Sequence, residues 1–283
     1  MTWCLVGSEM CIRDSLDADG NLSTLAEIPE QPSGLGWLPD GSLIIVSMLD
    51  RKLMKLKDGE LSIHADMSHL TPYQCNDMVI AKDGTAYVGN FGTDSVESKI
   101  HKTCLISVTQ EGETKICADG LLFPNGTVIS PDGKELIVGE TFGGNLTSFQ
   151  INESGELSHR AIWARVMPLH FKIITSIIRF LNIPLKESNS TPFPVPDGIC
   201  LDSDNGIWVA SPTTAEVIRF KKGGKITDRI ATPQPAYACM LGGKDEKELF
   251  ILTAESSNPQ FCKENKTGEI YKVEVDYERA GKP

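Results

Sequence analysis

At residues 196–204 the chain carries the stretch PDGICLDSD, whose pattern returns along most of the sequence. In each copy a β-rich run follows a turn aspartate, and the informative position lies seven residues before that aspartate. Counting back from the turn aspartates gives Ser33, Asn76, Asn125, Asp197 and Ala238. Because the blades of a β-propeller share one backbone, a position repeated from blade to blade forms a ring around the axis. We therefore expect Asn76, Asn125 and Asp197 to converge on one point.

The repeat predicts an all-β protein, a six-bladed β-propeller with an incomplete first blade. Five complete copies of the pattern follow one another, and a fragment that starts at Leu16 precedes them. We expect a single domain over residues 16–283. A β-sandwich would also show short strands and regular turns, but it would not repeat one polar position in phase.

Residues 1–15 do not read as part of a fold. The segment EMCIRDS at residues 9–15 resembles the translation of a sequencing-library adaptor, so we exclude residues 1–15 from fold reasoning and expect that the true N-terminus is lost. A signal peptide is the rival interpretation, but Glu9, Arg13 and Asp14 interrupt any apolar core.

A helical insertion is expected at about residues 165–188, between the third and fourth complete copies. Phe171, Ile174, Ile178 and Leu181 recur at helical spacing there. The segment 168–184 is too short and too polar to span a bilayer. We expect it to form a lid over the pocket mouth, with an oligomer contact or a membrane-surface contact as alternatives.

Composition limits the partners and the compartment. The 283 residues have a formal net charge of −11 at pH 7, and no basic stripe is present, which argues against a nucleic-acid partner. The eight cysteines show neither paired nor zinc-binding spacing. We therefore expect a reducing, cytoplasmic location.

The expected ring offers only oxygen ligands. Asn76, Asn125 and Asp197 form a hard donor set that favours Ca²⁺, with Mg²⁺, Mn²⁺ or Zn²⁺ left open. Taken singly, Asn125-Gly126 and Asp197-Gly198 could be simple turns. Their shared register favours metal ligation.

Four segments resemble the signature segments of the gluconolactonase, senescence-marker-protein and luciferin-regenerating-enzyme family of six-bladed propellers. They are CND at 75–77, FPNG at 123–126, PDGIC at 196–200 and ACMLGG at 238–243. The resemblance covers residues 16–283 and implies a divalent cation in the axial pocket, held by a glutamate, an asparagine and an aspartate. It gives the last two roles to Asn125 and Asp197, and it makes Asn76 a contact to substrate or to metal-bound water. The family glutamate has no counterpart here, and Gln74 stands where some members have an arginine.

The resemblance implies metal-assisted hydrolysis of a small lactone. Asp197 is expected to be a metal ligand and the general base toward water, with direct nucleophilic attack as an alternative. Gln74, Asn90, Phe91 and Glu140 end strands or precede ring residues, so we predict them to be substrate contacts. Two other functions fit the same ring, namely a non-catalytic propeller that binds a ligand or protein and a phosphotriester hydrolase.

Overall fold

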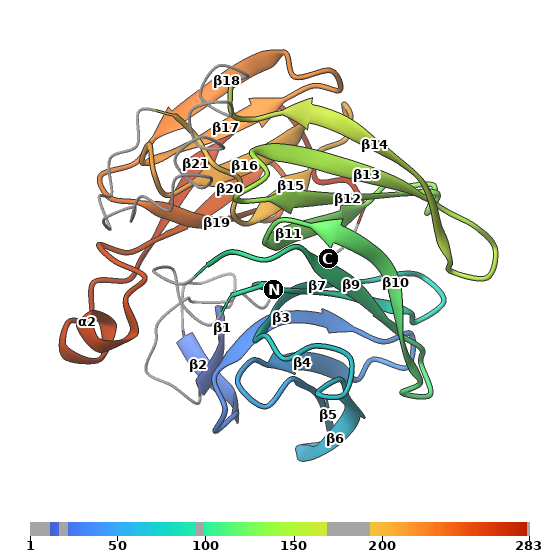
Figure 1. Ribbon diagram of the computed structural model, residues 1–283. Helices are drawn as coiled ribbons and strands as arrows, with labels where there is room; N and C mark the ends of the chain where they lie inside the picture. The colour runs from blue at the N-terminus through green and yellow to red at the C-terminus, as the bar shows by residue number, and fades with distance from the viewer. Residues whose placement is uncertain (1–11, 17–21, 94–98, 169–192, 282–283) are drawn as a thin grey trace.

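The computed structural model describes residues 12–16, 22–93, 99–168 and 193–281 of this chain. The described residues form an all-β propeller whose sheets are arranged radially around an axis (Figure 1). The segment predicted to be a helical lid falls almost entirely on residues 169–192, which lie outside the described residues, so the lid stays a prediction.

Five blades follow one another along the chain. The first contains β3 (Pro32–Trp37), β4 (Leu43–Ser47), β5 (Lys52–Lys57) and β6 (Glu60–Asp66). The second contains β7 (Cys75–Ile80), β8 (Ala86–Asn90), β9 (Thr103–Val108) and β10 (Thr114–Leu121). The third contains β11 (Pro124–Ile129), β12 (Glu135–Glu140), β13 (Asn145–Ile151) and β14 (Leu157–Arg165).

The fourth blade contains β15 (Ile199–Leu201), β16 (Ile207–Ser211), β17 (Glu216–Phe220) and β18 (Ile226–Ala231). The fifth has three strands, β19 (Ala236–Gly242), β20 (Glu248–Thr253) and β21 (Glu269–Glu274). All strand pairs within the blades are antiparallel. The complete copies of the sequence pattern therefore correspond to the five blades.

The predicted sixth blade is wrong. The N-terminal strands β1 (Ile12–Leu16) and β2 (Leu22–Glu27) pair with each other in a separate two-stranded sheet. This hairpin contributes no innermost strand, and its residue Ala26 packs against the cluster that contains Leu43 and Ile45 of the first blade. The hairpin also includes residues 12–15, which the sequence had led us to exclude. Residues 1–11 lie outside the described part of the chain, so the adaptor interpretation stays a prediction.

A short helix interrupts the fifth blade, and the sequence had not predicted it. This helix, α2, spans Pro259–Glu264 between β20 and β21. Asn258 caps it, because the Asn258 side chain accepts hydrogen bonds from the backbone N–H groups of Gln260 and Phe261. Within the described residues, no helix is long and apolar enough to cross a membrane.

The hydrophobic core lies between consecutive blades. One cluster joins the first and second blades, another the second and third, a third the third and fourth, and a fourth the fourth and fifth. The middle strands β4, β8 and β16 are buried along their whole length. Strands covered on both faces read as continuous apolar runs, which explains the β-rich segments of the sequence pattern.

The innermost strands pack against one another at the axis, in the order β3, β7, β11, β15 and β19. Glycines make this possible. A Cβ atom on Gly126 would lie 2.5 Å from the backbone nitrogen of Ile199, and a Cβ on Gly198 would lie 2.8 Å from the Cα of Ala238. Backbone hydrogen bonds cross between blades here, from Gly126 N to Asp197 O at 3.2 Å and from Gly198 N to Tyr237 O at 2.9 Å.

We predict that Gly126→Ala lowers the free energy of unfolding by about 2 kcal/mol or more, because the added methyl group must displace backbone atoms of the neighbouring blade. Urea denaturation followed by circular dichroism measures the change. Gly268→Ala is the matched control, since the nearest atom to its added Cβ would be 4.0 Å away. Equal stability of the two variants would show that the innermost strands separate at little cost.

Candidate functional site

The site is built from polar side chains near the beginning of successive innermost strands. Ser33 Oγ donates a hydrogen bond to Asn76 Oδ1 at 2.9 Å. Asn76 Nδ2 donates to Asn125 Oδ1 at 3.2 Å. The Asn125 side chain also lies close enough to the Asp197 carboxylate to lower the pKa of Asp197. The structure therefore brings the three predicted residues together in one chain of contacts across four blades, which we call the axial ring.

The fifth blade adds no ligand to the axial ring, and a residue outside the ring, Thr141, holds Asn125 in place. Ala238 of the fifth blade contributes no oxygen, and its Cα instead packs close to Gly198. Asn125 Nδ2 donates to Thr141 Oγ1 at 3.2 Å, and Thr141 Oγ1 donates to Pro196 O at 2.8 Å. Thr141 thus links the third blade to the segment before β15 that carries Asp197. Sequence reasoning missed this residue, because it lies outside the repeated position.

Asp197 carries the main electrostatic feature of the ring. Burial raises the pKa of Asp197 well above its usual range, and the nearby Asp77 carboxylate raises this pKa further. Hydrogen bonds from the Asn125 side chain and the Gly198 backbone act in the opposite direction and lower the pKa of Asp197. A cation beside Asp197 would reverse the balance, since positive charge favours the ionised carboxylate.

Asp77 is a site residue that sequence reasoning missed. It follows Asn76 at the position where glycine follows Ser33, Asn125 and Asp197. This departure from the glycine pattern is the sequence feature by which Asp77 could have been identified. Asp77 adds a second negative charge close to the axial ring.

The donor chemistry of the axial ring fits a hard cation. Its side chains present amide, hydroxyl and carboxylate oxygens, which are the ligand types that Ca²⁺ and Mg²⁺ prefer. Among the described residues, no group of three His, Cys, Asp or Glu side chains lies together in a way that could hold a metal. A cation at the ring would therefore depend on the neutral oxygens of the asparagines as well as on Asp197.

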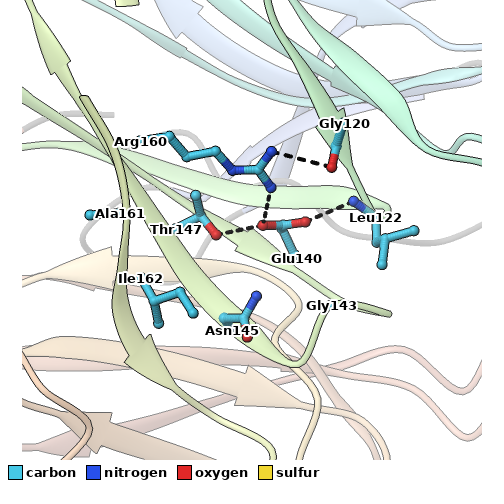
Figure 2. Close-up of a pocket in the computed structure, with 9 residues that line it drawn as sticks. All are labelled: Gly120, Leu122, Glu140, Gly143, Asn145, Thr147, Arg160, Ala161 and Ile162. Atoms are coloured by element: carbon cyan, nitrogen blue, oxygen red, sulfur yellow. Dashed lines mark hydrogen bonds and ion pairs between the residues drawn. The ribbon is translucent and has the colours of Figure 1, made fainter. Parts of the chain in front are cut away.

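Glu140, which the sequence predicts as a substrate contact, lines a separate pocket of about 370 Å³ (Figure 2). None of the axial ring residues lines this pocket. The Glu140 carboxylate accepts hydrogen bonds from Leu122 N at 2.8 Å, from Thr147 Oγ1, and from Arg160 Nη2 at 3.1 Å. These donors hold the Glu140 carboxylate within the third blade. Glu140 therefore does not belong to the axial ring.

The other predicted substrate contacts belong to the second blade. The side chain of Asn90 is fully buried. Its Nδ2 donates to Cys104 O at 2.9 Å, and its Oδ1 accepts from Thr103 Oγ1, so this amide is engaged inside the blade and does not support substrate contact. Phe91 and Gln74 are half-buried. Gln74 O accepts a hydrogen bond from Phe91 N at 3.0 Å, which holds the segments carrying these two residues together.

We predict that Asp197→Asn stabilises the cation-free protein at neutral pH. A carboxyl group whose folded-state pKa is raised gives its full contribution to stability below its ordinary pKa and loses it as the pH rises through the raised value. The variant should therefore be more stable than the wild type by about 1 kcal/mol or more at pH 7.5, because a tenfold change in the acid dissociation constant on folding corresponds to about 1.4 kcal/mol. The difference should vanish near pH 4.

Chemical denaturation in EDTA at both pH values measures this difference. Asp83→Asn, at an exposed turn, is the control and should show no such pH-dependent gain. A wild type as stable as Asp197→Asn at pH 7.5 would mean that the carboxylate is not disfavoured by its surroundings.

Relatives of known sequence match over part of the chain. This chain is 31% identical to regucalcin of Sus scrofa over 83 residues, and it is 28% identical to regucalcin of Gallus gallus over 83 residues. Each match spans 28% of this chain and 28% of the relative's own length.

Solved structures match over most of the chain. A luciferin-regenerating enzyme aligns with a TM-score of 0.73 at 16% identity, covering 97% of this chain and 88% of that protein. A calcium-binding regucalcin of Agrobacterium tumefaciens gives 0.73 at 18% identity, with 96% and 85% covered. A gluconolactonase of Xanthomonas campestris gives 0.65 at 22% identity, with 89% and 78% covered. These likenesses establish the fold.

The sequence match to a known family is broader. Residues 13–255 match the family described as the SMP-30/gluconolactonase/LRE-like region, which is most of the chain. The chain therefore belongs to the SMP-30/gluconolactonase/LRE-like family.

Proposed function

We propose that this protein is a divalent-metal-dependent hydrolase that opens a small lactone. The observation that carries the proposal is the axial ring, in which Asn76 bonds to Asn125 and Asn125 lies beside Asp197, a carboxylate of raised pKa, so that side chains from three successive blades come together. Membership of a family that includes gluconolactonases supports a lactonase-type hydrolase. A carboxylate such as Asp197, whose pKa is perturbed by burial and by a charged neighbour, is a candidate functional residue.

Asp197 and Asn125 would hold the cation, with Asn76 as the third ligand. When bound, a divalent cation supplies positive charge that polarises a carbonyl group and lowers the pKa of water. The calcium-binding regucalcin among the structural relatives supports Ca²⁺ as the cation. Mg²⁺, Mn²⁺ and Zn²⁺ are the other cations to be compared.

The residues of the chain then have distinct roles in ester hydrolysis. Asp197, once ionised, accepts the proton of the attacking water and so acts as the general base. The Asp197 side chain is half-buried, so its carboxylate keeps access to a water molecule. The Asn76 amide can donate a hydrogen bond to the substrate in place of its contact with Asn125. Thr141 keeps the Asn125 amide oriented while this exchange takes place.

We also propose a cytoplasmic location and a small-molecule partner. The six cysteines that the structure describes are all free thiols, which suits a reducing compartment. The negative net charge disfavours polyanions such as nucleic acids. Contact of residues 168–184 with substrate, another subunit or a membrane surface stays a prediction.

We predict that Asp197→Asn lowers turnover of a lactone by on the order of a hundredfold or more, because the change removes both ligand charge and base. A panel of lactones assayed by pH-stat with Ca²⁺, Mg²⁺, Mn²⁺ or Zn²⁺ measures it. Asp83→Asn is the matched control and should keep wild-type activity, since Asp83 lies at an exposed turn.

Two results would contradict the proposal in different ways. Near wild-type turnover by Asp197→Asn would remove Asp197 from the role of base. A wild-type protein that opens no lactone with any of the cations would favour the non-catalytic binding propeller.

A further inference from the structure

Three phenylalanines gather at the end of the second and third blades where the axial ring lies. Phe91 directly follows β8, Phe123 directly precedes β11, and Phe142 comes shortly after β12. The strand register pairs Cys75 with Asn90 and Pro124 with Glu140. Each second strand therefore ends beside the start of its innermost strand, which brings the three aromatic residues to the ring end of the propeller.

The three rings contact one another in sequence. Phe91 and Phe123 are stacked, with centroids 4.5 Å apart and planes 11° from parallel. Phe123 and Phe142 meet edge to face, with centroids 5.0 Å apart. Each ring is half-buried and so keeps part of its surface in contact with solvent. We call this group the aromatic platform.

The aromatic platform is continuous with the axial ring. Thr141, next to Phe142, accepts a hydrogen bond from Asn125 Nδ2 at 3.2 Å. The backbone N–H of Thr141 donates to Phe123 O at 3.1 Å. One residue thus connects a ring ligand to both aromatic segments, so a substrate held at the ring would lie within reach of the platform.

The backbone conformation of Phe123 is one that needs support from surrounding contacts. Its φ of +57° lies in the left-handed region, which is costly for a bulky residue. The cost is offset by surrounding contacts, including the hydrogen bond from Thr141 and the stack with Phe91.

Among the described residues, two polar side chains that the sequence predicts as substrate contacts, Asn90 and Glu140, are engaged in other contacts. Asn90 is buried and bonded inside the second blade. The Glu140 carboxylate is held by donors from Leu122, Thr147 and Arg160 in its own pocket. A polyhydroxylated substrate needs many polar partners, because its hydroxyl groups lose water on binding. The platform supplies aromatic faces instead.

We propose that the aromatic platform recognises a flat apolar group of the substrate, so that the lactone opened at the ring is an aromatic or similarly planar apolar lactone and not a sugar lactone. The inference rests on the proposed function. Aromatic side chains bind planar apolar groups by stacked and edge-to-face contacts, which the geometry of the platform already displays. The protein would then discriminate between an aromatic lactone and a sugar lactone by burying the apolar group of the aromatic lactone beside the axial ring.

The test compares dihydrocoumarin with glucono-δ-lactone in the presence of Ca²⁺. The wild type should show a kcat/KM at least about tenfold higher for dihydrocoumarin, the usual scale of discrimination by an apolar pocket. Phe91→Leu and Phe142→Leu keep the apolar volume but remove the aromatic face, so each should raise KM for dihydrocoumarin severalfold with little change in kcat. Trp37→Leu is the control, since Trp37 is an exposed aromatic residue at the opposite end of β3.

Binding of coumarin, followed by its fluorescence, provides a readout independent of turnover, and the two leucine variants should weaken it severalfold as well. A preference for glucono-δ-lactone, or variants that bind coumarin as tightly as the wild type, would overturn the inference and leave the hydrolase proposal intact. Failure to open any lactone, while coumarin still binds at the platform, would instead overturn the proposed function and the assignment of the platform to a lactone substrate.

Discussion

The close approach of the innermost strands at the axis is the constraint on which the rest of the structure depends. Where Gly34, Gly126 and Gly198 lie, a Cβ atom would meet backbone atoms of the next blade within 2.9 Å. Because each of these glycines follows a ring residue, the packing that joins the blades also sets the spacing of the polar side chains. The contacts from Ser33 to Asn76 and from Asn76 to Asn125 are consequences of that spacing.

In the second blade an aspartate, not a glycine, follows the ring residue, and this aspartate affects the pKa of Asp197. Asp77 occupies the place of the glycine, and its charge acts on Asp197 together with the effect of burial. Two neighbouring carboxylates are costly in a protein interior unless a cation or a proton accompanies them. The same arrangement that weakens the cation-free fold would therefore strengthen the attraction for a divalent cation, which links the stability of the axis to the proposed activity.

The sequence predicted that Asn76, Asn125 and Asp197 lie together, because a fixed spacing from each turn aspartate determines where these residues stand at the start of their blades. It failed on the blade count because the N-terminal strands β1 and β2 pair with each other, and pairing between segments is not encoded in a periodic pattern. It also identified the strand ends that carry Asn90 and Glu140 but not the directions of their side chains, which tertiary hydrogen bonds decide. Phe91 was predicted as a substrate contact from its place after a strand, whereas the grouping of Phe91 with Phe123 and Phe142 is seen only in their ring contacts.

Calorimetric titration of Ca²⁺ into the wild type and Asn125→Asp tests most directly whether the axial ring is a cation site. Ligand charge sets the affinity of hard-cation sites, so an added carboxylate at position 125 should increase the affinity for Ca²⁺ by about tenfold or more while one cation still binds per chain. The change also places a further negative charge next to Asp197, which should destabilise the cation-free protein and make its stability strongly dependent on Ca²⁺. Equal affinities in the two proteins, or no binding to either, would contradict the assignment of the axial ring as a metal-dependent site.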